Sequence, residues 1–282
     1  MLAIGVHLSI SKGLLKALDQ AKSLDSNAMQ VFIRNPRGYA KKVLDSNEVK
    51  KFIERRKEYG IDPLVIHGSY LLNIASSDER IRDKSISAIV EDLKLLSQVA
   101  AEYYVLHFGS NPDKVKGLNI MRESLIAIFK RINFKPLILL ENTAGEGDKL
   151  GWEIDDFKDL LKGKKGKLGI CLDSAHLFAS GVDLGNSREL DAFLMEFDKK
   201  VGVDSIKLLH LNDSNTPCCS KRDRHAHIGE GFIKSKGISN FINHPKLKRL
   251  PIILETPKGK EKDDIKNLNK VKYLKRNACR FL

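Results

Sequence analysis

Short apolar runs recur along the chain, separated by segments in which apolar residues are spaced three or four apart. Eight such runs lie near residues 3–9, 28–33, 63–68, 103–108, 137–142, 168–173, 206–211 and 251–256. Helical spacing is clearest in residues 77–101, 120–132, 190–201 and the basic tail 258–282. Strands that alternate with helices predict a parallel sheet, and eight such units predict a closed (β/α)8 TIM barrel.

The length of 282 residues fits one barrel, so we expect a single TIM-barrel catalytic domain over residues 1–282. A doubly wound open sheet is the alternative, but it would place ligands at one switch point between strands. No apolar stretch approaches the ~20 residues that cross a bilayer, and the first residues lack the charged start of a signal peptide. We therefore expect an intracellular protein that does not insert into membranes.

Six of the eight runs end in a residue type that binds metal ions. Together with three residues in the following loops, the candidate ligands are His67, His107, Glu141, Asp173, His176, His210, Asp223, His225 and Glu255. Barrel enzymes carry their chemistry at the C-terminal ends of the strands, so these side chains should meet in one cup. Imidazoles mixed with carboxylates suit Zn²⁺, Mn²⁺ or Fe²⁺ better than Ca²⁺. At three protein ligands per catalytic zinc, nine residues can hold up to three ions.

The other histidines and the cysteines carry weaker signals. His244 lies in a polar turn and is expected to be exposed. His7 and His227 can contact the substrate or can hydrogen-bond to the metal ligands, and the sequence leaves both roles open. No cysteine pair has the CxxC spacing of a metal or redox motif. The adjacent Cys218 and Cys219 lie in a loop near the predicted site. They can have a redox or metal-binding role there, or they can lie near the site without a function in it.

The charge of the chain indicates a polyanionic partner. Lys and Arg outnumber Asp and Glu by 49 to 36, which gives a formal net charge of +13. Such a surface suits nucleic acid, although charge that serves only solubility is the alternative. The cations expected around the cup are Arg34, Arg37, Lys221, Arg222, Arg224, Lys258 and Lys260. Several metal ions inside a basic surround are typical of phosphodiester cleavage, and no nucleophilic-serine or phosphate-loop motif competes with that interpretation.

Several long segments carry a family resemblance. They are HGSYLLNIA from His67, GKLGICLDSAH up to His176, HLNDS from His210, DRHAHIGEG from Asp223, and the opening IGVHLSISKGL. Over nearly its whole length the chain resembles the endonuclease IV family of apurinic/apyrimidinic endonucleases.

The resemblance implies three zinc ions and a hydrolytic reaction. One ion would take His67, His107 and Glu141, and Glu141 would bridge to a second ion. The second ion would take Asp173, His210 and Glu255, and the third His176, Asp223 and His225. Glu141 and Glu255 are the residues expected to act in catalysis. A metal-bound hydroxide would attack the phosphate 5′ to an abasic site, leaving a 3′-hydroxyl and a 5′-deoxyribose phosphate. Mn²⁺ or Fe²⁺ can replace zinc, and accessory 3′ trimming is typical of the family.

The resemblance also implies a monomer that binds duplex DNA containing abasic sites. Arg37 and Tyr70 match the family's side chains that enter the duplex at the lesion, and Lys221, Arg222 and Arg224 are expected to contact the backbone. Such an enzyme would work in the cytoplasm, at the nucleoid if the source is bacterial.

This chain departs from the family pattern in the loop after the seventh strand. Asn215 stands where the family usually has Lys, Cys218 and Cys219 replace a Leu-Gly pair, and His227 replaces Asn. These changes leave the predicted ligands intact and alter the phosphate contacts of that loop. Two alternative functions remain at this stage: a metal-dependent sugar isomerase or epimerase of the same barrel type, and a non-catalytic, metal-stabilised DNA-binding protein.

Overall fold

The predicted TIM barrel is confirmed. The computed structural model describes residues 2–36, 38–39, 44–134, 136–163, 166–260 and 262–277. Parallel strands close a barrel in the order β1-β10-β7-β6-β5-β4-β3-β2. The strands are β1 (Ile4–Leu8), β2 (Ala28–Phe32), β3 (Leu64–His67), β4 (Tyr103–His107), β5 (Leu137–Glu141), β6 (Leu168–Asp173), β7 (Ile206–His210) and β10 (Ile252–Leu254). Each lies inside one of the eight predicted apolar runs.

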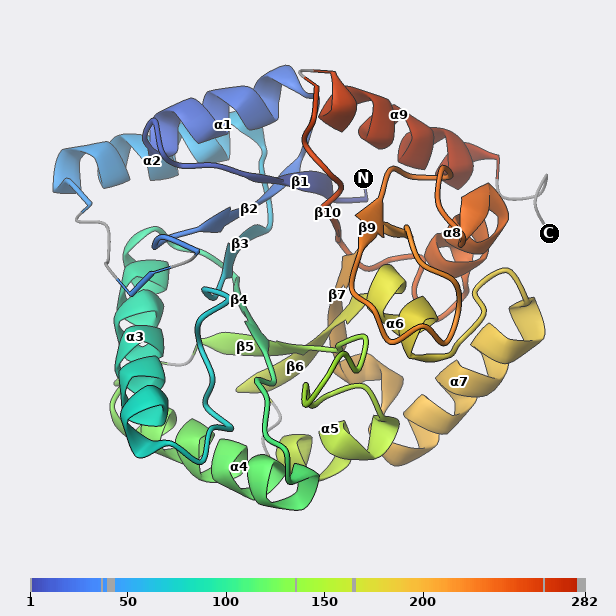
Figure 1. The fold of residues 1–282 in the computed structure, drawn as a ribbon. Helices are drawn as coiled ribbons and strands as arrows, with labels where there is room; N and C mark the ends of the chain where they lie inside the picture. Colours follow the sequence, from blue (N-terminus) through green and yellow to red (C-terminus); the bar gives the residue numbers. More distant parts are fainter. Residues whose placement is uncertain are drawn as a thin grey trace.

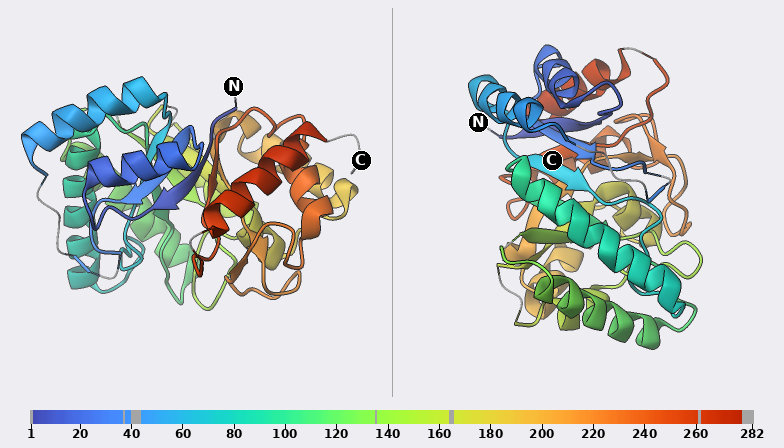
Figure 2. Two further views of the ribbon diagram at one scale, coloured as in Figure 1. Left: turned by 90° about the horizontal axis from the view of Figure 1, so that it is seen from above. Right: turned by 90° about the vertical axis from the view of Figure 1, so that its left-hand side faces the viewer.

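Helices surround the closed sheet, as the view along the barrel and two further views show (Figure 1 and Figure 2). They are α1 (Leu14–Ser23), α2 (Ser46–Tyr59), α3 (Glu79–Gln98), α4 (Lys114–Lys130), α5 (Ile154–Leu161), α6 (Ser174–Ser180), α7 (Ser187–Lys200), α8 (Lys234–Asn243), α9 (Asp263–Arg276) and the 3₁₀ turn η1 (Val203–Ser205). Each of the four segments with helical spacing overlaps one of these helices, namely α3, α4, α7 or α9. The carboxylates of Asp45, Asp78 and Asp113 cap α2, α3 and α4 by accepting backbone N–H bonds. None of the described helices is long and apolar enough to cross a membrane.

The barrel interior explains why the strand ends carry the ligands. A small apolar cluster fills the interior, with one residue from each of seven strands: Ala28, Val65, Val105, Leu139, Cys171, Leu208 and Ile253. Side chains two positions apart point to the same face of a strand. The residues two positions further along these strands therefore point into the same end of the barrel, and they include six of the predicted ligands.

The pairing of β1 with β2 depends on a glycine. A Cβ at Gly5 would lie 2.0 Å from the backbone oxygen of Ala28, its register partner. Gly5→Ala is therefore expected to destabilise the fold by about 1–3 kcal/mol, as overpacking in a tight core does. Chemical denaturation of the variant measures this loss. Gly259→Ala is a matched control, because its Cβ would meet nothing closer than 3.6 Å. Equal unfolding midpoints for the two variants would contradict the prediction.

A two-stranded hairpin extends the loop after β7. Strands β8 (Asp213–Ser214) and β9 (His225–Ala226) pair antiparallel. Because β9 begins at His225, the hairpin holds Asp223 and His225 over the strand ends. Two-residue strands leave no periodic pattern, so the sequence does not predict this hairpin.

Candidate metal centre

One layer of polar side chains caps the barrel interior at the C-terminal ends of the strands. Each strand supplies one member two residues beyond its interior position: His7, Gln30, His67, His107, Glu141, Asp173, His210 and Glu255. Six of these are predicted ligands. His7 had been left open and Gln30 had not been singled out.

Glu141 lies at the centre of this layer and is fully buried. Its Oε2 is 3.2 Å from His67 Nε2 and 3.4 Å from His107 Nε2. Its Oε1 is 2.8 Å from His210 Nδ1. The two oxygens of one carboxylate therefore face histidines on different sides, an arrangement suited to bridging two cations.

Two groups of candidate ligands have their ligand atoms within 4.8 Å of one another. The first contains His67, Glu141, His210 and Glu255. Within it, His210 Nδ1 lies 3.3 Å from Glu255 Oε2. These four residues come from β3, β5 and β7 and from the end of β10, so the barrel itself fixes their spacing.

The second group contains Asp173, His176 and His225. Asp223 joins it, because its carboxylate oxygens lie 3.1 Å from His176 Nε2 and 3.3 Å from His225 Nε2. Both ring nitrogens are buried and make no hydrogen bond within the described residues. The structure thus brings all nine predicted ligands to one end of the barrel.

Backbone oxygens orient three of the candidate ligand histidines. The outer nitrogens of three rings lie near backbone oxygens, at 2.7 Å for His67 and Gly68, 2.8 Å for His176 and Asn142, and 3.2 Å for His225 and Glu255. A carbonyl oxygen only accepts, so these outer nitrogens carry a proton, and the inner nitrogen of each ring is the one that can ligate a cation.

This donor set fits divalent cations. An inner ring nitrogen that gives up its proton, set beside carboxylate oxygens, offers ligands to a cation, and outer-nitrogen bonds of this kind are typical of metal-ligating histidines. Imidazoles with carboxylates are the ligands that Zn²⁺, Mn²⁺ and Fe²⁺ share.

Burial and charge act in opposite directions on the ring pKa values. Burial lowers the pKa of His107 to about 4. Burial also lowers the pKa of His176, but the carboxylates of Asp173 and Asp223 outweigh it and raise that pKa to about 10. The pKa of His210 in the first group is likewise raised well above its ordinary value, because Cys171, Glu255 and Glu141 outweigh burial. Both groups therefore have a negative field, which favours a bound cation.

Two buried asparagines that are not candidate ligands hold Asp173 and Glu255 in place. Asn212 donates to Asp173 Oδ2 over 2.7 Å and accepts from the backbone N–H of Glu255 over 2.9 Å. Asn142 accepts from the backbone N–H of Asp173 over 2.6 Å. The signal for these residues was present in the sequence: each Asn directly follows, or nearly follows, an apolar strand that ends in a ligand type.

The rim of the cup carries an exposed aromatic residue and a small cavity. Tyr70 is 62% exposed, and its ring centroid lies 5.1 Å from that of Phe32. Beside it a cavity of about 170 Å³ is lined in part by His107, Lys149 and Asp223. A ligand in this cavity would touch two candidate metal ligands: His107, which lies beside Glu141, and Asp223, which lies beside His176 and His225.

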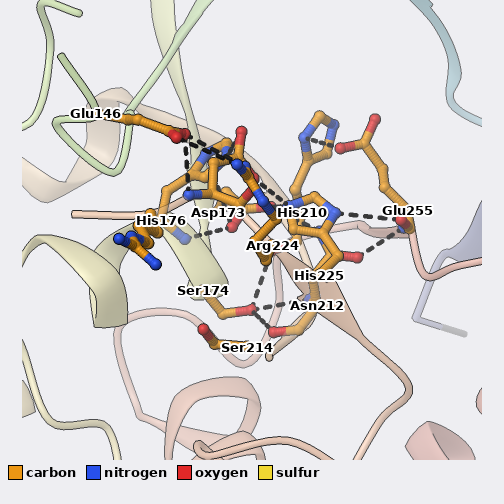
Figure 3. A network of polar contacts seen from close by, with 12 residues as sticks. Glu146, Asp173, Ser174, His176, His210, Asn212, Ser214, Arg224, His225 and Glu255 are labelled. Carbon is orange, nitrogen blue, oxygen red and sulfur yellow. Dashed lines mark hydrogen bonds and ion pairs between the residues drawn. The ribbon is translucent and has the colours of Figure 1, made fainter. Parts of the chain in front are cut away.

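The predicted rim cations differ in their surroundings. Lys221 Nζ lies 3.8 Å from the ring centroid of Trp152, and Arg224 is 3.3 Å from Glu146 Oε1 (Figure 3). Arg222 is exposed in the same loop. Arg37 lies outside the described residues. All three described cations stay predicted DNA contacts.

The prediction for Arg34 is wrong. Its side chain is buried, with Nε 2.7 Å from Asp92 Oδ1 on α3, so it does not line the cup. Burial raises the pKa of Asp92 to about 6 despite this pairing. A cation that follows a strand can turn outward between the sheet and a helix, and position in the sequence alone does not reveal this.

The remaining residues singled out by sequence lie as follows. Lys258 reaches the backbone oxygen of His7 and pairs with Asp264, which places it beside the layer. His227 contacts Asn267 on α9, and His244 pairs with Asp191. The Sγ atoms of Cys218 and Cys219 are 3.8 Å apart in the hairpin loop.

The barrel and its ligand layer define a class of proteins that includes metal-dependent enzymes. A family model described as "Xylose isomerase-like TIM barrel" matches residues 18–275. The fold alone also resembles that of a D-tagatose 3-epimerase-like protein, at a TM-score of 0.70 and 21% identity over 98% of each chain.

Closer likenesses narrow this class. A protein named "Probable endonuclease 4" from Halothermothrix orenii is 41% identical over 92% of this chain and 96% of its own length. The crystal structure of endonuclease IV from Thermus thermophilus has a TM-score of 0.87 and 32% identity, covering 96% of this chain and 98% of that one. The chain belongs to the endonuclease 4 family within the xylose isomerase-like TIM barrels.

Proposed function

We propose that this protein is a divalent-metal-dependent endonuclease that cleaves DNA on the 5′ side of abasic sites. The products would be a 3′-hydroxyl and a 5′-deoxyribose phosphate, with 3′ trimming as an accessory activity. The observation that carries the proposal is the pair of histidine–carboxylate clusters at the strand ends, in a chain that belongs to the endonuclease 4 family.

The proposed cofactor is three zinc ions, for which Mn²⁺ or Fe²⁺ can substitute. His67, His107 and Glu141 would hold one ion, and Asp173, His210 and Glu255 a second that shares Glu141. The third would take His176, Asp223 and His225. The opposite orientation of the two Glu141 oxygens supports a shared ligand. When bound, such ions lower the pKa of water and stabilise negative charge on phosphate oxygens.

The chain's own residues supply binding and proton transfer in this proposal. Glu255 Oε2 would take the proton of the attacking water, because Oε1 already accepts a hydrogen bond from Gln30. Tyr70, exposed at the rim, would fill the gap in the duplex at the lesion. The cavity beside His107 would receive the extruded sugar. Lys221, Arg222 and Arg224 would contact the phosphate backbone, with the net charge of +13 attracting DNA.

A sugar epimerase on the same fold is a weaker explanation. Such an enzyme needs about four ligands around one or two ions, since each catalytic ion takes about three protein groups. Here the cluster of Asp173, His176 and His225 adds a second centre to the first. A non-catalytic DNA-binding protein would have no use for a cavity that opens onto the ligands. We propose further that the protein acts as an intracellular monomer.

Incision of a duplex oligonucleotide that carries one abasic analogue tests the function. We expect a single cut 5′ to the analogue, seen by gel electrophoresis as a product with a 3′-hydroxyl that a polymerase extends. An undamaged duplex of the same sequence is the control. Equal cutting of both duplexes, or of neither, would contradict the proposal.

A further inference from the structure

Gln30 is a buried amide at the centre of the ligand layer. It lies on β2 inside the apolar run AMQVF and is fully buried. Three polar side chains from other strands surround it, although they are distant in the sequence. Its Nε2 lies 2.5 Å from Glu255 Oε1 and 2.9 Å from His7 Nδ1, and its Oε1 lies 2.8 Å from His210 Nε2. Both amide N–H groups and the carbonyl therefore have a partner.

The chemistry of the partners fixes the orientation of the amide. A carboxylate oxygen only accepts, so the NH₂ end of Gln30 must face Glu255. The carbonyl end then faces His210 and accepts from its Nε2–H. The proton on Nε2 leaves Nδ1 as the ring atom that can ligate a cation, and it faces Glu141 Oε1, 2.8 Å away, and Glu255 Oε2, 3.3 Å away.

His210 differs in this respect from the other ligand histidines whose outer bonds are described. His67, His176 and His225 bond to backbone oxygens. A backbone oxygen remains when the side chain of its residue is substituted. His210 bonds to a side chain, which a substitution can remove. The same side chain also holds the carboxylate of Glu255.

We propose that Gln30 is a positioning residue of the metal site, which fixes the tautomer of His210 and the orientation of Glu255. The inference rests on the proposed metal centre. Without Gln30, the His210 ring is free to carry its proton on Nδ1 and to donate to the two carboxylates. In that tautomer, a proton on Nδ1 would occupy the position where a cation is expected. Loss of an outer partner of a ligand histidine typically weakens metal affinity about 10–100-fold.

Gln30→Met tests the proposal, because methionine is close in volume but offers no amide donor or acceptor. We expect its zinc affinity, measured by competition with a chromophoric chelator, to fall about 10–100-fold. The wild-type protein and Gln98→Met, which alters an exposed glutamine on α3, should bind alike. Unchanged thermal unfolding of the metal-free variant would show that the fold is intact.

Nitrogen NMR of histidine-labelled protein gives a readout that a general loss of packing would not move. The His210 resonances, assigned with His210→Gln and followed in zinc-free protein at a pH where the ring is neutral, should show Nε2 protonated in the wild-type protein and lose that signature in Gln30→Met. Gln30→Glu keeps an acceptor for Nε2–H, so the signature should persist there. This second variant decides the question if Gln30→Met fails to fold, since a proton moved to Nδ1 in it would overturn the proposal.

The outcomes separate this inference from the proposed function. Wild-type protein that binds no divalent ion would overturn the metal centre and this inference with it. Ions bound equally well by wild-type protein and Gln30→Met, with Nε2 protonated in both, would overturn the role of Gln30 alone.

Discussion

Glu255→Gln is expected to reduce incision at an abasic site by about 10²–10⁴-fold, the usual contribution of a positioned acid–base group. The carboxylate of Glu255 faces an N–H of Gln30 on one side and the His210 ring on the other. Glutamine would present an N–H donor to one of these sides. It would also remove one negative charge from the first cluster and the proton acceptor for the attacking water.

Binding and cleavage should separate in this variant. Fluorescence anisotropy with a duplex that carries an abasic analogue should give a dissociation constant close to that of the wild-type protein, because Glu255 lies below the rim that would meet the DNA. Glu196→Gln is a matched control, since it removes the same charge from an exposed position on α7. Wild-type rates of incision by Glu255→Gln would exclude the proposed role.

The fold was predictable because its signal is distributed over the whole chain. Eight short apolar runs separated by helical stripes allow few architectures. The main parts that could not be predicted are local. The β8–β9 hairpin has two residues per strand, and Arg34 turns into the space between the sheet and α3 to pair with Asp92. Neither depends on a repeated pattern.

The ligand layer was predictable for a different reason. His67, His107, Glu141, Asp173 and His210 are the last residues of their strands, and strand ends meet in a barrel. Gln30 occupies the same layer but precedes the end of β2, inside an apolar run. Its role follows only from register: it lies two residues after Ala28 on the interior face, as His67 lies two after Val65. Register between distant strands is a property of the closed barrel and cannot be read from one strand alone.

Geometry also adds what the order of residues could not provide, namely which candidate ligands lie near one another. The ligand atoms of His67 lie close to those of His210 and Glu255 as well as Glu141, and Asp173 groups with His176 and His225. Sharing of ligands is thus built into the cup, and the number of ions becomes the decisive measurement.

Removal of metal is expected to abolish incision, and added zinc should restore it. The fold brings the candidate ligands together, so the ions bind the folded chain and not the unfolded one. Ion binding therefore stabilises the folded state, by about 4 kcal/mol for an ion at a thousand times its dissociation constant. Dialysis against a chelator, followed by removal of the chelator, should lower the unfolding temperature and the activity together.

Metal analysis of the reconstituted protein should give close to three zinc ions per chain. The prediction follows from nine candidate ligands at one end of the barrel, seven of them in two groups, with Glu141 facing histidines through both oxygens and about three protein groups for each catalytic ion. His176→Ala is the informative variant, because it removes one ligand from the second cluster and leaves His67, Glu141, His210 and Glu255 in place. It should retain two ions. One ion per chain in the unmodified protein would instead favour a sugar epimerase, whose chemistry needs no second cluster.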